Sequence, residues 1–189
     1  MRAFIAIDLP TNIKNKLSKI QDKLKDNFAQ INWVKPQNLH LTLKFLGEIT
    51  SEQSSAINRI IAEISQTIIP FKIKLDDLGA FPNLHNPRII WVGISQDVYA
   101  QQIAELLETK IADIGIAKGS HPFAAHITIG RIKSPILGSD LENELRKIKE
   151  NTIFADLEFQ TQGFTLFKST LGPGGPTYTV LQEVNFRII

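Results

Sequence analysis

The chain has 189 residues, no cysteine, and a formal net charge of +2 at pH 7. This length suffices for a substantial hydrophobic core, whereas the lack of cysteine excludes disulfides, thiolate zinc sites and cysteine nucleophiles and is typical of a cytoplasmic protein. No apolar stretch approaches the length of a membrane span, and the weak charge argues against a protein that coats nucleic-acid duplexes.

Strand-like and helix-like patterns alternate along the chain, and no low-complexity linker separates them. We predict strands at about residues 2–8, 31–34, 39–47, 71–78, 88–94, 124–132, 153–167 and 177–188. We predict helices after Pro10, from Ser51 to Pro70, at about 97–113, and after a capping box of Ser139 and Glu142. Loops are predicted at Gly79–Pro87 and Gly172–Pro176. This order favours an α+β fold.

The pattern His, apolar, Thr, apolar occurs twice, at residues 40–43 and at residues 126–129. Residues two apart in a strand point to the same side, so each copy places an imidazole beside a hydroxyl. Two such faces brought together supply two histidines for proton transfer and two hydroxyls for an oxyanion. This set suits phosphate ester chemistry without a metal. The repeat also suggests two lobes of similar plan within one domain, residues 1–189.

Strict alternation makes a prediction for the residues that follow each motif. It places Lys44 on the face of the first motif and Phe45 on the opposite face. In the second strand it points Arg131 away from the motif side chains. A bulge at Gly130 would turn Arg131 back, so we predict irregular pairing near Gly130 if Arg131 contributes to the site.

Both motifs lie within longer segments that carry a resemblance over nearly the whole chain, namely residues 2–10, 38–47, 78–82, 87–93, 123–131 and 169–178. On these segments the chain resembles the two-histidine (2H) phosphoesterase superfamily, and within it the RNA 2′,3′-cyclic phosphodiesterases, also called 2′-5′ RNA ligases. One departure is Ala125, where the family usually has proline before the second histidine. The change frees the backbone slightly and removes no catalytic group.

The resemblance implies a bilobed fold of two antiparallel sheets, with helices on the outer faces and the two motif strands facing across a central cleft. It implies hydrolysis of RNA 2′,3′-cyclic phosphate ends to 2′-phosphates without metal or cofactor, and in some members reversible 2′-5′ ligation of tRNA halves. The residue roles that it implies are His40 as general acid at O3′, His126 as general base, Thr42 and Thr128 holding phosphate oxygens, and Arg131 stacking on the terminal base or holding phosphate. We expect a cytoplasmic monomer that contacts no membrane.

Other functions stay open at this stage. The same site could act on ADP-ribose cyclic phosphate or on 2′-5′ oligoadenylates, and a cleft without turnover would make the chain an RNA-end-binding module. A metallohydrolase is disfavoured, because the four histidines form no ligand pair at helical spacing. The sequence does not determine the roles of Phe4, Phe45, His121 and Tyr178, although core packing is the simpler interpretation of both phenylalanines.

Overall fold

Two antiparallel sheets and four α-helices make up the part of the chain that this computed structural model describes, residues 1–95, 98–152, 154–173 and 175–187. The strands are β1 (Arg2–Asp8), β2 (Ile31–Trp33), β3 (His40–Glu48), β4 (Lys72–Phe81), β5 (Ile89–Ile94), β6 (His126–Ile132), β7 (Glu158–Gln160), β8 (Gly163–Gly172) and β9 (Gly175–Asn185). The helices are α1 (Thr11–Lys25), α2 (Ser51–Ser65), α3 (Val98–Ala112) and α4 (Gly138–Asn151).

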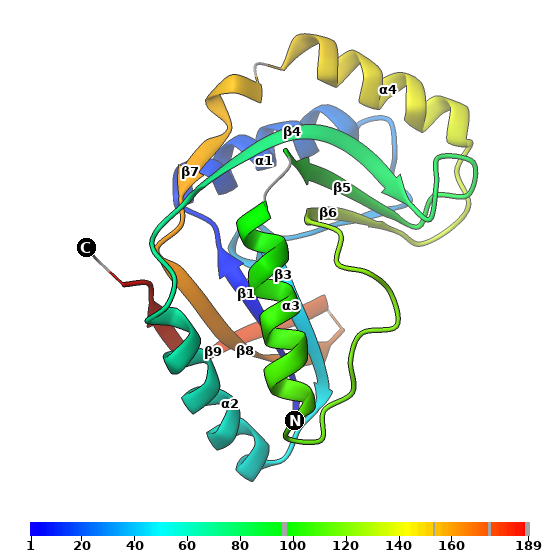
Figure 1. Ribbon diagram of the computed structural model, residues 1–189. Coiled ribbons are helices and arrows are strands. Elements are labelled where there is room, and N and C mark those ends of the chain that lie inside the picture. The colour runs from blue at the N-terminus through cyan, green and yellow to red at the C-terminus, as the bar shows by residue number, and fades with distance from the viewer. Residues whose placement is uncertain (96–97, 153, 174, 188–189) are drawn as a thin grey trace.

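The strands of the two sheets are interleaved along the chain. The first sheet has the order β3-β1-β8-β9 and the second has the order β2-β6-β5-β4-β7. The central part of each sheet follows one plan, because β3-β1-β8 in the first corresponds to β6-β5-β4 in the second. The predicted α+β fold with two antiparallel sheets is therefore confirmed, and Figure 1 shows that neither sheet is built from one contiguous half of the chain.

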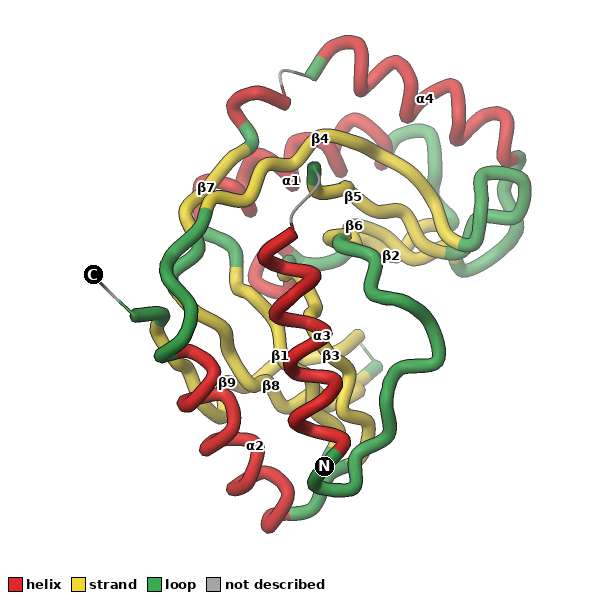
Figure 2. The backbone as a smooth tube through the Cα atoms, viewed as in Figure 1, coloured by secondary structure: helices red, strands yellow, loops and turns green. Residues whose placement is uncertain are grey.

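Two of the helices cross from one sheet to the other. Helix α1 follows β1 of the first sheet but contacts β6 of the second, whereas α3 follows β5 of the second sheet and contacts β3 of the first. Helix α2 contacts β8 and β9, and α4 contacts β4. Figure 2 shows α2 and α3 beside one strand layer and α4 along the other. Each motif strand is thus covered by a helix that follows a strand of the other sheet: α3, which follows β5, covers β3, and α1, which follows β1, covers β6.

Burial of the apolar residues fixes the orientation of both motif strands. Leu41 and Leu43 in β3 and Ile127 and Ile129 in β6 are all buried in the core. Burying a side chain of this size stabilises the fold by about 1.5–3 kcal/mol, so these four residues hold the strands firmly. The histidine and threonine between them are directed to the opposite face, which leaves them available for a site.

Helix interiors agree with the predicted patterns better than helix ends do. The apolar stripe of α1 is buried as expected, and so is that of α4 at Leu141, Leu145 and Ile148. Helix α2, however, ends at Ser65 rather than at Pro70. No helix in the described ranges is long and apolar enough to cross a membrane.

The predicted capping box at Ser139 is wrong. Helix α4 begins at Gly138, with Leu137 at the N-cap and no side-chain hydrogen bond there. Ser139 therefore lies inside the first turn, where its hydroxyl cannot cap the helix. A capping box occurs instead at α2, where the Thr50 hydroxyl accepts the Gln53 N–H at 3.1 Å and the Gln53 side chain accepts the Thr50 N–H at 3.0 Å.

Three strand boundaries also differ from the prediction. Strand β4 continues to Phe81, through residues that the sequence assigned to a loop, because its pairing with β5 is maintained to that point. The predicted strand at 153–167 is instead a 3₁₀ turn (Phe154–Asp156), the short β7 in the second sheet, and β8 in the first. Strands β8 and β9 pair as far as Gly172 and Gly175, so both ends of the predicted loop belong to strands, and residue 174 lies outside the described residues. The expected boundaries at 97, 153 and 188 lie outside the described residues.

Candidate active site

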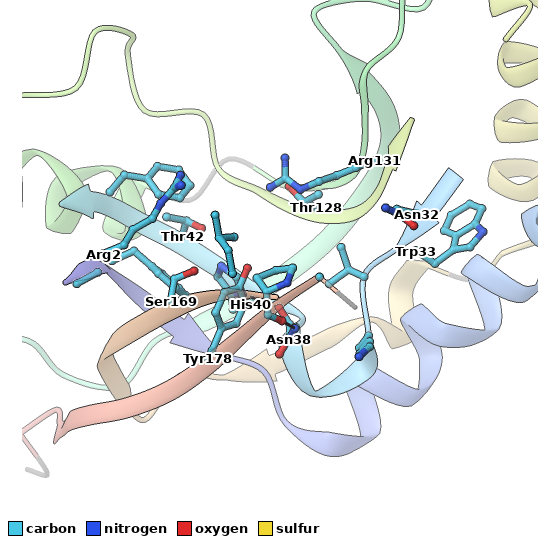
Figure 3. A pocket seen from close by; sticks show the side chains of 18 of the residues that line it. Arg2, Asn32, Trp33, Asn38, His40, Thr42, Thr128, Arg131, Ser169 and Tyr178 are labelled. Carbon is cyan, nitrogen blue, oxygen red and sulfur yellow. Dashed lines mark hydrogen bonds between the residues drawn. The ribbon is translucent and has the colours of Figure 1, made fainter. Parts of the chain in front are cut away.

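All five site residues expected from the sequence line one cavity of about 590 Å³, a size typical of ligand pockets. Strands of both sheets form its walls. Figure 3 shows Thr128 and Arg131 on one wall, facing His40 and Thr42 on the other, and His126 also lines the cavity. The fold thus brings together residues that are far apart in the sequence.

The two histidines are held by the same backbone contact. Nδ1 of His40 lies 2.7 Å from the carbonyl oxygen of Asn38, and Nδ1 of His126 lies 2.6 Å from that of Ala124. A carbonyl only accepts hydrogen bonds, so Nδ1 carries the hydrogen in each neutral ring. Nε2 is then left with a lone pair that can take up a proton, and the protonated ring can return it.

The second motif strand carries the irregularity predicted near Gly130. In the pairing of β6 with β5, Thr128 lies opposite Trp91 but Gly130 lies opposite Ile90, so one residue of β6 has no counterpart. This shift reverses the alternation of the residues after it. Arg131 accordingly lines the cavity, and the predicted departure from regular pairing is confirmed.

The first motif strand carries the same irregularity, which the sequence did not reveal. Thr42 lies opposite Ala6 while Lys44 lies opposite Ile5. The two assignments made from strict alternation are therefore wrong. Lys44 is buried away from the cavity, with no exposed side-chain surface, whereas Phe45 lines the cavity and is 67% exposed. Core packing is not the role of Phe45.

Polar side chains of the crossover helices support both strands from behind. The side-chain amide of Gln21 on α1 donates to the carbonyl of Ile129 at 2.8 Å. Ile129 is the residue of β6 that has no counterpart in β5. Lys44 donates to the carboxylate of Glu108 on α3 at 2.6 Å. Each strand is thereby tied to the helix that packs against it, so the position of its motif depends on that helix.

Burial lowers the pKa of both imidazoles. It lowers the pKa of His40 from 6.5 to about 4, although the hydrogen bond to Asn38 and the negative charge of Asp8 act in the opposite direction. Burial also lowers the pKa of His126, and the positive charge of Arg131 adds to this effect. Both rings are therefore neutral at pH 7 in the unliganded protein, and a bound anion would raise both pKa values.

The cavity is strongly cationic. Its walls include Arg2, Lys35, Arg131 and Lys133, and no aspartate or glutamate is found among its described lining residues. None of these four cations forms a salt bridge within the described ranges. Positive side chains without acidic partners, in a concave site, attract an anionic ligand.

Aromatic rings surround the histidines. The ring of Phe4 lies 4.8 Å from that of His40, and Tyr178 meets the His40 ring edge-on at 5.3 Å. Phe81 meets the ring of His126 edge-on at 4.9 Å. These contacts restrict both imidazoles, and burial raises the pKa of the Tyr178 hydroxyl, which keeps it protonated.

Several cavity residues were not expected from the sequence. Asn32, Lys35 and Lys133 line the cavity, but they lie outside the motifs and only the pairing of β2 with β6 brings them there. His121 is exposed and is not among the lining residues. The described residues include no group of three or more histidine, cysteine or acidic side chains that could hold a metal ion.

The comparisons with known proteins agree with this geometry. The family model described as "LigT like Phosphoesterase" matches twice, at residues 7–91 and 92–178, so each match contains one motif. The RNA 2′,3′-cyclic phosphodiesterase of Methanocaldococcus jannaschii is 37% identical, with 97% of this chain and 99% of that protein covered. The protein of the same name from Aquifex aeolicus is 36% identical, with coverages of 97% and 96%.

Solved structures show the same similarity. The crystal structure of TT0787 of Thermus thermophilus superposes with a TM-score of 0.83 at 30% identity, covering 99% of this chain and 98% of that one. The crystal structure of E. coli LigT complexed with 3′-AMP has a TM-score of 0.77 at 30% identity, with coverages of 98% and 97%.

Proposed function

The chain belongs to the LigT-like phosphoesterase family, and from this premise we propose that it is an RNA 2′,3′-cyclic phosphodiesterase that converts cyclic phosphate ends to 2′-phosphates. The observation that carries the proposal is the pair of His-x-Thr motifs lining one cationic cavity. Relatives of this name match over nearly their full length. The site supplies two proton-transfer groups and positive charge, which are what the opening of a cyclic phosphodiester needs.

In this reaction we assign His126 as general base and His40 as general acid. Nε2 of His126 takes a proton from water as the water oxygen attacks phosphorus in line with O3′. The P–O3′ bond breaks, and O3′ receives a proton from Nε2 of His40. The products are a 2′-phosphate and a free 3′-hydroxyl. Exchange of protons with solvent returns both rings to their starting states.

The acid role requires His40 to be protonated when substrate is bound. The cyclic phosphate carries one negative charge, and its arrival raises the pKa of both imidazoles. Asp8 lies opposite His40 in the pairing of β1 with β3. Its negative charge favours the protonated form of His40 and has no corresponding effect on His126. Burial nevertheless takes the pKa of His40 to about 4, so its role as the acid depends on the bound phosphate raising that pKa.

The remaining motif residues are proposed to bind the phosphate. Thr42 and Thr128 each present a hydroxyl beside a catalytic histidine, and these hydroxyls can donate to the two non-bridging oxygens as charge develops. Arg131 follows Thr128 on the same wall and supplies a positive charge. Hydrogen bonds aimed at developing charge stabilise the transition state more than the ground state.

Four further assignments complete the proposal. A ribose hydroxyl in place of water would give 2′-5′ ligation by the same proton transfers, and tRNA halves are a suitable pair of ends. We assign residues 1–189 to one bilobed domain, because the interleaved strands prevent either sheet from forming without the other half of the chain. We also assign the protein to the cytoplasm, on the absence of cysteine from the sequence, and assign it as a monomer.

The test is hydrolysis of an RNA oligonucleotide ending in a 2′,3′-cyclic phosphate, in the presence of EDTA. The wild-type chain should release a 2′-phosphate, and His40→Ala and His126→Ala should each lose about 10²–10⁴-fold in kcat. His121→Ala is the matched control, because His121 is exposed and is not among the lining residues of the cavity. Binding without turnover by the wild type would contradict the proposal. So would a preference for ADP-ribose cyclic phosphate or 2′-5′ oligoadenylate.

A further inference from the structure

The two ends of the cavity differ in chemistry. One end is formed by β1, β3 and the β8–β9 hairpin, and it includes Arg2, Phe45 and Leu171. The other end is formed around β2 and β6, and it includes Asn32, Lys35 and Lys133. Figure 3 shows Arg2 on one side of His40 and Asn32 on the other. The histidines and threonines therefore lie between an apolar end, whose one cation among the described lining residues is Arg2, and a cationic end, which presents Lys35 and Lys133.

The apolar end presents two large side chains that the core does not bury. Phe45 is 67% exposed and Leu171 is 68% exposed, and both line the cavity. The Phe45 ring reaches the site only because of the register shift in β3. An exposed aromatic ring in a cavity wall is a stacking surface for a nucleic acid base, and such stacking tolerates any base.

The cationic end presents side chains suited to a phosphate. Arg131 lies on β6 after its irregularity, and Lys133 follows directly after the end of β6, where its N–H donates to the carbonyl of Gln30 at 2.9 Å; both side chains line the cavity. Asn32 on β2 lies opposite Arg131 on β6, so β2 adds a side-chain amide donor beside these cations. Lys35 follows directly after β2 and also lines the cavity. A phosphate held here would meet donors from both strands.

The shape of a nucleotide matches this division. In a 2′,3′-cyclic phosphate, the phosphorus bridges C2′ and C3′, the base leaves from C1′, and the chain continues toward the 5′ side from C4′. C1′ and C4′ lie on opposite edges of the ribose. When the cyclic phosphate is fixed between the two motifs, the base therefore extends toward one end of the cavity and the 5′ phosphate toward the other.

We propose that the terminal base stacks on Phe45 and Leu171 while the phosphate on the 5′ side of the terminal nucleoside binds Lys35 and Lys133. The inference rests on the proposed function and adds an orientation for the terminal nucleotide and a second phosphate subsite. It also places O3′ on the cationic side, because its carbon, C3′, is bonded to C4′. His40 begins β3 directly after the short 3₁₀ turn that follows Lys35, which fits its assignment as the acid at O3′.

The experiment compares kcat/KM for three substrates that share one base: a nucleoside 2′,3′-cyclic phosphate, its 5′-phosphorylated form, and a dinucleotide ending in the cyclic phosphate. The Lys35→Ala/Lys133→Ala double variant should lose about tenfold on the two substrates with a 5′ phosphate, and little on the nucleoside. Phe45→Ala should lose about tenfold on all three. Lys110→Ala on α3, an exposed lysine away from the cavity, is the control for loss of a surface charge.

Each outcome decides a different statement. If the lysine variant loses equally on all three substrates, or the Phe45→Ala loss depends on the 5′ phosphate, the proposed orientation is overturned. If the wild-type chain shows no preference for a 5′ phosphate, the second phosphate subsite is overturned while the proposed function stands. If the wild type hydrolyses none of the three substrates or a longer RNA end, the proposed function itself fails.

Discussion

The two motif strands share a backbone plan but differ in nearly every side chain around it. In both, a carbonyl two residues earlier holds the histidine, and a register shift follows the threonine. The shift then directs Phe45 into the cavity from β3 and Arg131 from β6. The shared plan supplies two equivalent imidazoles, and the differing surroundings make it possible for one to donate a proton while the other accepts one.

The supports behind the strands differ in the same way. Position 44 in β3 is a buried lysine paired with Glu108. The equivalent position in β6 is Gly130, where a Cβ would come within 2.8 Å of Ile31 and 3.2 Å of Trp33. A lysine could not replace this glycine without displacing β2. The two halves therefore differ at this position because their neighbouring elements differ, and not because the chemistry requires it.

The largest expected effect comes from removing both histidines at once. If the two rings act in one concerted transfer, the His40→Ala/His126→Ala double variant should lose little more than the worse single variant, whose loss is about 10²–10⁴-fold. Single-turnover rates on the cyclic phosphate RNA end measure this. If the rate loss of the double variant equals the product of the two single losses, the two histidines act independently, which would contradict a concerted transfer.

The threonines should be nearly equivalent. Thr42→Val and Thr128→Val keep the side-chain shape and remove one hydroxyl each, and losing one donor to a developing oxyanion costs about 10²–10³-fold in kcat. Equal losses in kcat with small changes in KM would support transition-state binding from both strands. A loss confined to KM at either position would show that the hydroxyl binds the ground state only.

The supports behind the strands should contribute unequally to stability. Glu108→Gln leaves Lys44 buried without a carboxylate and should lower the free energy of unfolding by about 3 kcal/mol. Gln21→Leu removes the amide donor from the Val34 carbonyl and one of the two donors of the Ile129 carbonyl, and it should cost about 1–3 kcal/mol. Urea titrations measure both. The Lys44→Met/Glu108→Leu double variant leaves no unpaired charge, so it should regain most of the loss, and no recovery would contradict a charge-based account.

At neutral pH the smallest effect on stability is that of His40 protonation, because it is felt only in acid. The pKa of His40 is about 4 in the folded chain and near 6.5 when unfolded. Below pH 6.5 the unfolded state therefore binds more protons, and stability falls as the pH drops toward 4. Above pH 6.5 this contribution is fully present. Melting temperatures of the wild type and His40→Asn should converge as the pH falls, because the variant lacks this proton uptake, and parallel curves would contradict the burial of His40.

Much of the site could be predicted from the sequence because a strand has a fixed period. Alternation alone placed His40 beside Thr42 and His126 beside Thr128, and a bulge was expected in β6 because Arg131 could not otherwise reach the cleft. The equivalent shift in β3 was missed because Lys44 is polar and looks like a cleft residue under strict alternation. Its burial depends on Glu108, which a distant helix supplies.

The cationic end could not be predicted because it depends on strand pairing. Asn32 and Lys133 line the same cavity because β2 pairs with β6, which lies about a hundred residues later in the chain. No local pattern encodes that pairing. The same holds for the crossover of α1 and α3 between the sheets. Local periodicity determines which face a residue takes, whereas tertiary pairing determines which faces meet.

The most direct test of the unequal roles of the two strands replaces O3′ of the cyclic phosphate with sulfur. A thiolate leaves without needing a proton, because a thiol is far more acidic than an alcohol. With this substrate His40→Ala should recover most of its lost rate, whereas His126→Ala should recover none, because water still has to be deprotonated. Recovery by His126→Ala, or by neither variant, would contradict the assignment of His40 as the acid that serves O3′.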